Sequence, residues 1–168
     1  MKEINILKLK EILEEHEYWL ETKNKSGERA DLSDTNLSNM NFKGVNLKFA
    51  NLQNADLSES NFSKANLQGS DLQGANIHLT NFTDANLINV DFRGCARSYA
   101  KFIRADLSYA NLSGVDINES VCREANFHGA NLSGASTWHT DLRGADLTDA
   151  NLENVGMDHA YLDHEDEK

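Results

Sequence analysis

Cysteine is scarce in this chain of 168 residues, and its two copies, Cys95 and Cys122, exclude several structural classes. Two cysteines at irregular spacing are too few for a disulfide framework or a thiolate zinc site. The sequence also lacks any run of roughly 18 consecutive apolar residues, the length that a membrane-spanning helix requires. We therefore expect buried free thiols, no membrane association and a soluble cytoplasmic protein.

Basic residues are in deficit, because 16 lysines and arginines stand against 27 aspartates and glutamates, for a net charge of −11. A strongly acidic protein repels nucleic acid and anionic membrane surfaces. We therefore expect no direct nucleic-acid contact. Cationic proteins, or proteins that themselves bind DNA, are the predicted partners.

Catalytic signatures are missing as well. The sequence contains no glycine-rich phosphate loop, no nucleophile elbow and no His-Glu-x-x-His motif. We predict a protein without enzymatic activity, catalytic residues, cofactor or bound metal.

The chain does contain an internal repeat of five residues. The frame that begins with Ala30-Asp31-Leu32-Ser33-Asp34 continues without a shift to His164, which gives 27 repeats over 135 residues. Leu, Phe or Ile fills the central position 23 times, and Ala stands two residues earlier 15 times. Asn or Asp precedes the centre 21 times. Such regularity over most of the chain indicates that packing dictates the sequence.

A period of five fits neither a lone α-helix nor a flat strand. The chain is therefore expected to turn a corner within each repeat. The large central residue and the small residue two places before it would point inward, and the other three positions would face water. Asn and Asp before the centre favour a turn, because their side chains bond to their own backbone.

This pattern resembles the pentapeptide-repeat family. The resemblance implies an all-β solenoid, namely a right-handed quadrilateral β-helix of about seven coils, with four repeats in each coil. Residues 20 apart would then be stacked neighbours. We expect the β-helix to span residues 30–164, after a capping helix and linker at 1–29 and before an acidic tail at 165–168.

Residues 1–29 lack the repeat and show a helical stripe made of Ile6, Leu9, Leu13, His16 and Leu20. A helix placed before the first coil can cover the open end of a solenoid. We predict that it caps the solenoid, and the alternative is membrane or partner binding. His16 is interpreted as a packed helix residue, not a ligand.

The last coil contains Met157, Tyr161 and Leu162, and no capping helix follows it in the sequence. We expect end-to-end homodimerisation through these residues, as the family resemblance also implies. The alternative is that the acidic tail folds back or that the end frays.

One side of the expected solenoid departs from the repeat. Three of the four non-standard centres, Arg97, Thr137 and Met157, are separated by multiples of 20 residues and fall on that side. Exposed aromatic side chains beside arginine are typical of binding surfaces. We predict a partner-binding surface with Arg97, Tyr99 and Trp138 as anchors, and the alternative is that repeat decay is merely tolerated there. The predicted set is Leu79, Arg97, Tyr99, Trp138, His139 and His159.

Two functions follow from these observations. The first is a non-enzymatic scaffold that binds an unknown protein partner. The second is a DNA mimic that modulates a topoisomerase, as the similarity to quinolone-resistance pentapeptide proteins implies for DNA gyrase. A weaker third hypothesis is metal binding by His139 and His159, which are 20 residues apart and have no evident third ligand.

Overall fold

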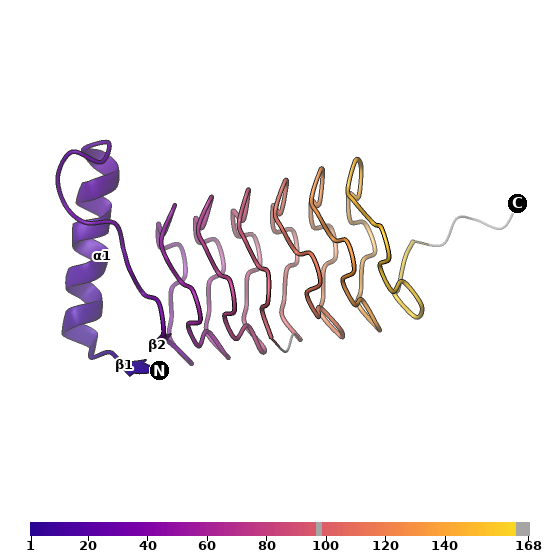
Figure 1. Cartoon of the computed structure of the whole chain (residues 1–168), viewed down its shortest axis with the longest axis horizontal. Helices are drawn as coiled ribbons and strands as arrows, with labels where there is room; N and C mark the ends of the chain where they lie inside the picture. The colour runs from indigo at the N-terminus through magenta and orange to yellow at the C-terminus, as the bar shows by residue number, and fades with distance from the viewer. Residues whose placement is uncertain (97–98, 164–168) are drawn as a thin grey trace, which may run out of the picture.

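A computed structural model describes residues 1–96 and 99–163 of the chain. Its named elements are β1 (Lys2–Glu3), α1 (Ile6–Glu21) and β2 (Thr35–Asn36). From Ala30 onward the chain winds as a rod of stacked coils, with α1 lying across one end (Figure 1). Among the described residues, no helix is both long and apolar enough to cross a membrane.

The coils are joined by parallel backbone bridges between residues 20 apart, from Asp31 with Asn51 to Asp141 with Tyr161. Each coil therefore holds four pentapeptides, and each pentapeptide forms one side of the rod. We number these sides by their first central residue, so that face 1 begins at Leu32, face 2 at Leu37, face 3 at Phe42 and face 4 at Leu47. Every twentieth residue after these belongs to the same face.

The core consists of the central residue and the small residue of each repeat, which are both buried along most of the rod. Phe42, Phe62, Phe82 and Phe102 form a stacked column on face 3, with ring centroids 4.7, 5.6 and 5.2 Å apart. The expected buried thiols are confirmed, since Cys95 and Cys122 are both free and buried. Burial raises the pKa of both thiols, that of Cys95 to about 12.

The corner of each repeat lies after the central residue. The fifth residue of each repeat, from Asp34 to His159, has a left-handed φ between 52° and 72°. A hydrogen bond closes the turn, as where the Val45 N–H donates to the Phe42 carbonyl at 3.1 Å. These features define a type II turn, which requires φ above zero at its third position.

The Asn or Asp before the centre supports this turn. In all 21 repeats that have one, its Oδ1 accepts a hydrogen bond from the backbone N–H two residues later. The predicted bond between side chain and backbone is therefore confirmed. The corner itself lies farther along the repeat than this residue.

Helix α1 contacts the first coil through part of the predicted stripe. Asn5 caps its start by accepting a hydrogen bond from the Lys8 N–H at 2.8 Å. Leu9 and His16 are buried, and Leu13 is half-buried against the core. The assignment of Ile6 to the buried stripe was wrong, because its side chain is 72% exposed. Ile6 is the first residue of the helix, with only Ile4 and Asn5 between it and β1.

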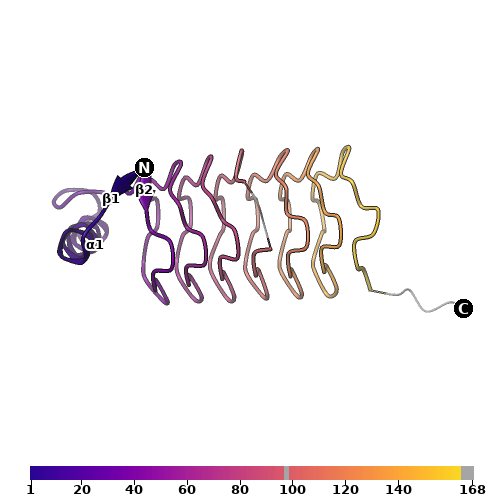
Figure 2. The same cartoon turned by 90° about the horizontal axis from the view of Figure 1, so that it is seen from below.

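Strand β1 was not predicted from the sequence. It pairs in parallel with β2, with Lys2 opposite Thr35 and Glu3 opposite Asn36. Figure 2 shows β1 beside the first coil and α1 almost end-on. The Lys2 N–H donates to the Asp34 carbonyl at 2.6 Å. This strand therefore occupies part of the edge that a preceding coil would otherwise cover.

His16 joins α1 to the solenoid. Its Nδ1 accepts a hydrogen bond from the Ala30 N–H at 3.1 Å, and its ring stacks on Trp19 at 5.6 Å. Burial lowers the pKa of His16, although the backbone of Lys48 opposes this effect, and the nearby charge of Arg29 lowers it further. The interpretation of His16 as a packed helix residue agrees with these contacts.

Candidate binding face

Faces 2 and 3 depart from the turn chemistry of faces 1 and 4. Six repeats lack Asn or Asp before the centre, and they divide equally between face 2, at Ala96, Ser136 and Gly156, and face 3, at Lys101, Val121 and Tyr161. At Trp138 a neighbouring coil replaces the missing acceptor, because Asn118 Oδ1 accepts from the Trp138 N–H at 2.6 Å. Asn118 also accepts a hydrogen bond from the Ser136 hydroxyl at 2.7 Å. The sequence thus departs from the repeat pattern here, and the Trp138 N–H still has a hydrogen-bond acceptor.

A row of side chains projects from the fifth position of the repeats on face 2. Leu79 and Tyr99 lie next to each other on successive coils, and each is 45% exposed. Trp138 stands one residue earlier in its own repeat and is also 45% exposed. Large apolar side chains at a left-handed position gain nothing from the turn itself. The row, from start to end, is Asn39, Glu59, Leu79, Tyr99, Glu119, His139 and His159.

Exposed aromatic side chains on face 4 have a structural explanation that face 2 lacks. Phe49 lies over Gly69, where an added Cβ would come within 2.7 Å of the ring. Tyr109 covers Gly129 in the same way, at 2.6 Å. On face 2, Leu79 and Tyr99 are followed by Tyr99 and Glu119, so no glycine lies beneath them. Leu79 and Tyr99 on face 2 therefore do not serve to cover a glycine of the next coil.

Tyr99 is held by two neighbours. Its hydroxyl donates to Glu119 Oε1 at 2.8 Å. Its ring packs edge-to-face with that of His78, with the ring centroids 5.5 Å apart. The carboxylate of Glu119 raises the pKa of Tyr99. These contacts fix the ring in an outward position, which lowers the entropy cost of binding a partner.

A second aromatic group lies farther along the row. The ring centroids of Trp138 and His139 are 3.9 Å apart, and the ring centroid of His139 is 5.8 Å from those of both His159 and Tyr161. His139 Nδ1 is 3.2 Å from the Tyr161 hydroxyl. The structure thus brings the two predicted histidines together and adds Tyr161, which sequence reasoning assigned to the dimer interface.

The other predicted residues are placed as follows. Arg97 lies outside the described residues. Met157 is half-buried in the last coil, whereas Tyr161 and Leu162 are 50% and 45% exposed. Sequence reasoning missed Glu59, Glu119 and Asn118, although their spacing of 20 or 40 residues from Leu79, Tyr99 and Trp138 would have revealed them.

Two family models match this chain. One, described as a pentapeptide repeat region, covers residues 45–121, and the other, described as pentapeptide repeats in eight copies, covers residues 125–163. This chain belongs to the pentapeptide-repeat family. The resemblance inferred from the five-residue frame is thereby confirmed. No curated protein matches the chain.

Solved structures similar to this pentapeptide-repeat protein include QnrB1, a plasmid-mediated fluoroquinolone resistance protein. It is 23% identical over 80% of this chain and 82% of its own, with a TM-score of 0.49. A pentapeptide repeat protein from the Arabidopsis thaliana thylakoid lumen is 28% identical over 70% and 68%, with a TM-score of 0.44. HetL from Nostoc sp. strain PCC 7120 is 24% identical over 85% and 93%, with a TM-score of 0.22.

Charge is distributed unevenly around this pentapeptide-repeat rod. Faces 1 and 2 are adjacent, and Arg93 is their one described lysine or arginine. Face 3 carries six of the eight described basic residues of the solenoid. The carboxylates of faces 1 and 2 are Asp31, Asp34, Asp56, Glu59, Asp71, Asp91, Asp116, Glu119, Glu153 and Asp158. The cations of face 3 are Lys43, Lys64, Lys101, Arg104, Arg123 and Arg143.

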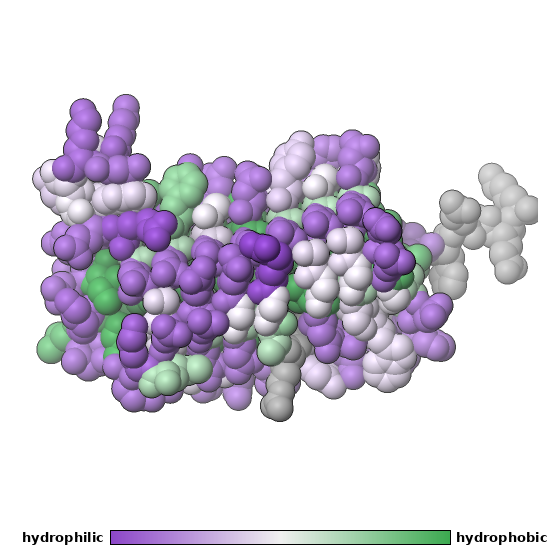
Figure 3. Space-filling model, in the orientation of Figure 1, coloured by the Kyte–Doolittle hydropathy of each residue, from purple (hydrophilic) through white to green (hydrophobic). Residues whose placement is uncertain are grey.

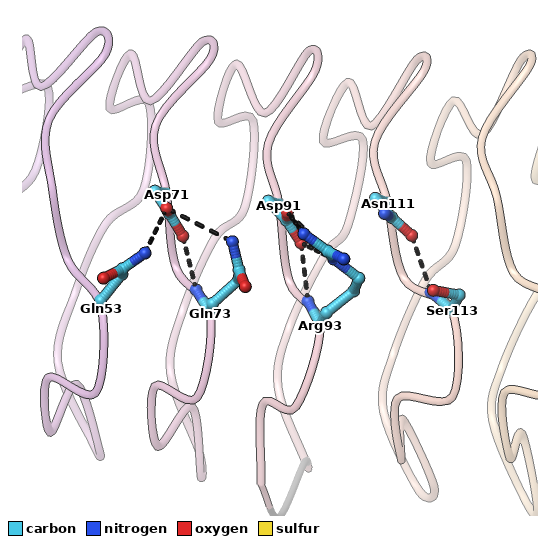
Figure 4. Close-up of polar contacts among 7 residues, drawn as sticks. All are labelled: Gln53, Asp71, Gln73, Asp91, Arg93, Asn111 and Ser113. Atoms are coloured by element: carbon cyan, nitrogen blue, oxygen red, sulfur yellow. Dashed lines mark hydrogen bonds and ion pairs between the residues drawn. The ribbon is translucent and has the colours of Figure 1, made fainter.

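Many of these charges are already engaged within the protein. Figure 4 shows Asp71 on face 1 accepting hydrogen bonds from Gln53 of the preceding coil at 2.6 Å and from the Gln73 N–H at 3.0 Å. Burial alone would raise the pKa of Asp91, but the hydrogen bonds that it accepts from Arg93 and the charge of that guanidinium together lower it. Carboxylates at the position before the centre thus accept hydrogen bonds within their own repeat. Carboxylates at the fifth position do not accept this bond and point toward solvent.

Other candidate sites are weaker. A groove of about 440 Å³ lies between α1 and the first coil and is lined by Ile6, Leu9, Leu13, Met40 and Phe42 with two polar neighbours. Figure 3 shows apolar surface at this end of a largely hydrophilic molecule. Within residues 1–96 and 99–163, no group of three or more His, Cys, Asp and Glu side chains is arranged to hold a metal.

Proposed function

We propose that this pentapeptide-repeat protein is a non-enzymatic, cytoplasmic scaffold that binds another protein through face 2. The observation that carries the proposal is the exposed row of Leu79, Tyr99 and Trp138 at positions where the fold requires no large apolar side chain. Tyr and Trp are the residues most enriched among those that dominate binding energy. In this proposal the rod has about seven coils, and α1 caps its first coil.

The rigidity of the rod supports this proposal. Each coil is tied to the next by backbone hydrogen bonds, such as Glu59 N–H to the His78 carbonyl at 2.8 Å and Glu119 N–H to the Trp138 carbonyl at 2.9 Å. A surface held in this way loses little conformational entropy when a partner binds. Face 2 thus presents preformed contacts in place of a catalytic cleft.

Site-specific photocrosslinking in cells tests the proposal. A photoreactive phenylalanine analogue at position 99 or 138 should yield adducts with the same partner, because both positions face outward on face 2. The matched control is position 109 on face 4, where the tyrosine covers Gly129. A partner crosslinked equally from position 109, or none from positions 99 and 138, would contradict the assignment of face 2.

The second candidate function is mimicry of DNA toward a topoisomerase such as DNA gyrase. It is favoured by the ten carboxylates that line faces 1 and 2 against one described arginine. An acidic surface of this kind can occupy a basic DNA-binding groove. The cations of face 3 restrict such mimicry to one side of the rod.

A supercoiling assay with purified gyrase separates the two candidates. Mimicry predicts inhibition that strengthens as the protein is titrated, or protection of gyrase from a quinolone. Replacing Glu59 and Glu119 with glutamine should weaken either effect. Unchanged supercoiling over the whole titration would rule out gyrase as the target and leave the scaffold proposal.

A further inference from the structure

We propose that face 2 binds an extended basic segment of its partner, with Lys or Arg at two positions four residues apart and an apolar residue midway between them. This inference rests on the proposed scaffold function, because it names the kind of partner that face 2 fits. It is carried by the order of side chains along the row. Glu59 and Glu119 bracket Leu79 and Tyr99 on four successive coils.

The four side chains leave the backbone in the same way. The φ angles of Glu59, Leu79, Tyr99 and Glu119 lie between 55° and 58°. All four residues are exposed. The row is therefore a regular array in which the backbone conformation is constant and only the side chain, acidic or apolar, changes from coil to coil.

The spacing of the row matches an extended peptide. Glu59 and Glu119 are three coils apart, and coils joined by backbone hydrogen bonds lie about 4.8 Å apart, so the two carboxylates are separated by roughly 14 Å. In an extended chain, residues i and i+4 are also about 14 Å apart and point to the same side, with residue i+2 midway. Cations at i and i+4 can thus meet Glu59 and Glu119 while residue i+2 contacts Leu79 and Tyr99.

A helical partner does not fit this array. A distance of about 14 Å along a helix corresponds to nine residues, which places the two side chains on opposite sides of the helix. Nucleic acid does not fit either, because its phosphates would face the carboxylates of face 2. The observations therefore favour an extended basic segment over both.

The bracketing carboxylates are available to cations. The carboxylate of Glu59 has no hydrogen-bond or ion-pair partner among the residues that the structure describes, although its backbone N–H donates to the His78 carbonyl. Glu119 accepts one hydrogen bond, from the Tyr99 hydroxyl at 2.8 Å, and a carboxylate has further lone pairs for a second donor. Asp56 and Asp116 stand three residues before the two glutamates and add negative charge to both ends of the array.

An NMR titration of the full-length protein tests the inference with two peptides of equal composition. The first, GSRTLTRSG, has the proposed spacing, and the second, GSRTRTLSG, exchanges the leucine with the second arginine, so that the two arginines are only two residues apart. We expect the first peptide to bind at least about fivefold more tightly at low salt. Binding of this peptide should shift the amide resonances of residues 59, 79 and 119.

Matched variants locate the contacts. Glu59→Gln and Glu119→Gln should each weaken binding of the first peptide by about fivefold, the effect of losing one exposed ion pair. Glu153→Gln, on face 1, is the control and should leave the affinity unchanged.

The outcomes separate this inference from the proposed function. Equal affinity for the two peptides, or an equal loss in the Glu153→Gln variant, would show general charge attraction and overturn the inference. If neither peptide binds while photocrosslinking at position 99 still captures one partner, the inference is wrong and the scaffold function stands. If binding survives but crosslinks arise equally from position 109, the assignment of face 2 to a cellular partner is wrong.

Discussion

The fifth residue of each pentapeptide is the position where backbone and side chain make different demands. The turn requires a left-handed φ there, which favours glycine, asparagine and aspartate. Leucine, phenylalanine, tyrosine, glutamate and histidine nevertheless occupy it in several repeats. Each such residue carries a conformational cost, and the rod tolerates it because the bonds between coils hold the backbone in place.

Replacing a glycine at this position measures that cost. Gly114 has a φ of +67°, and an added Cβ would meet no atom within 4 Å. We expect Gly114→Ala to lower the free energy of unfolding by about 1 kcal/mol, because only the left-handed backbone opposes the methyl group. Chemical denaturation of the purified variant measures this change.

Gly156 provides the matched control. An added Cβ there also meets no atom within 4 Å, but its φ is not left-handed. Gly156→Ala should leave stability unchanged or raise it by up to about 1 kcal/mol, since alanine restricts the unfolded chain. Equal losses in the two variants would show that the left-handed turn is not the cause.

Asp141 is the one described carboxylate of the rod that is bonded to two arginines. It accepts hydrogen bonds from the guanidinium groups of Arg143, at 2.8 Å, and of Arg123. These bonds hold the pKa of Asp141 far below its ordinary value. A depressed pKa contributes stability above the ordinary carboxyl value, and this stability is lost as the pH falls toward the depressed pKa.

We therefore expect Asp141→Asn to lower the free energy of unfolding at pH 7 by about 1–2 kcal/mol, a value reduced by the exposure of both arginines. The difference from the wild type should shrink as the pH is lowered below about 4. Glu153→Gln is the control, because Glu153 is exposed and its carboxylate has no hydrogen-bond or ion-pair partner among the described residues. Denaturation curves at pH 7 and pH 3 test both variants, and an equal loss at the two values would exclude the ionic origin.

At the scale of the element, the sequence predicted what the inside of a repeat needs but not where the chain bends. Leu32 and Ala30 mark their inward positions because only apolar or small side chains fit there. The left-handed position is marked too, because eight of the ten glycines of the chain stand at the fifth position of a repeat, although Asp34, Phe49 and Leu79 also adopt it. Sequence reasoning missed that signal. Strand β1 left no mark, because two residues are too few for a pattern to emerge.

Face 2 was predictable in part for the same reason. Trp138 and Tyr99 stand out as aromatic side chains at outward positions, so counting in steps of 20 groups them. The contact of Tyr99 with Glu119 and that of Trp138 with Asn118 depend on which acceptor each coil leaves free. That choice follows from three-dimensional packing, which the repeat alone does not specify.

Helix α1 is attached to the first coil through His16, a residue that titrates, so the stability of this attachment should depend on pH. His16 must be neutral for its Nδ1 to accept from the Ala30 N–H. Burial lowers its pKa in the folded state, so this contact is fully stabilising above about pH 6.5 and weakens as the pH falls toward the lowered pKa. Arg29 lies close enough to oppose the added positive charge.

We expect α1 to detach at lower urea concentration at pH 5 than at pH 7.5. Trp19, which stacks on His16, reports this step by fluorescence in a Trp138→Phe background. His16→Gln is the control, because glutamine can accept the same hydrogen bond without titrating. The same pH dependence in the His16→Gln variant would mean that another group controls the helix.

At the scale of the whole molecule, the two ends of the rod differ in what covers them. Leu9, Leu13 and β1 lie against the first coil. In the last described coil, Leu152 and Leu162 are 38% and 45% exposed, whereas Leu112 and Leu132 at equivalent inner positions are at most 2% exposed. A further covering layer would bury them, and a second copy of this end can supply it.

We therefore predict a homodimer joined through Met157, Tyr161 and Leu162. Light scattering of the purified protein at micromolar concentration should give twice the monomer mass. Leu162→Glu should convert the dimer to a monomer, because a carboxylate in this interface would be buried without a partner. Leu79→Glu adds the same charge on face 2 and should leave the dimer intact, whereas a wild-type monomer at every concentration would show that the last coil needs no second copy.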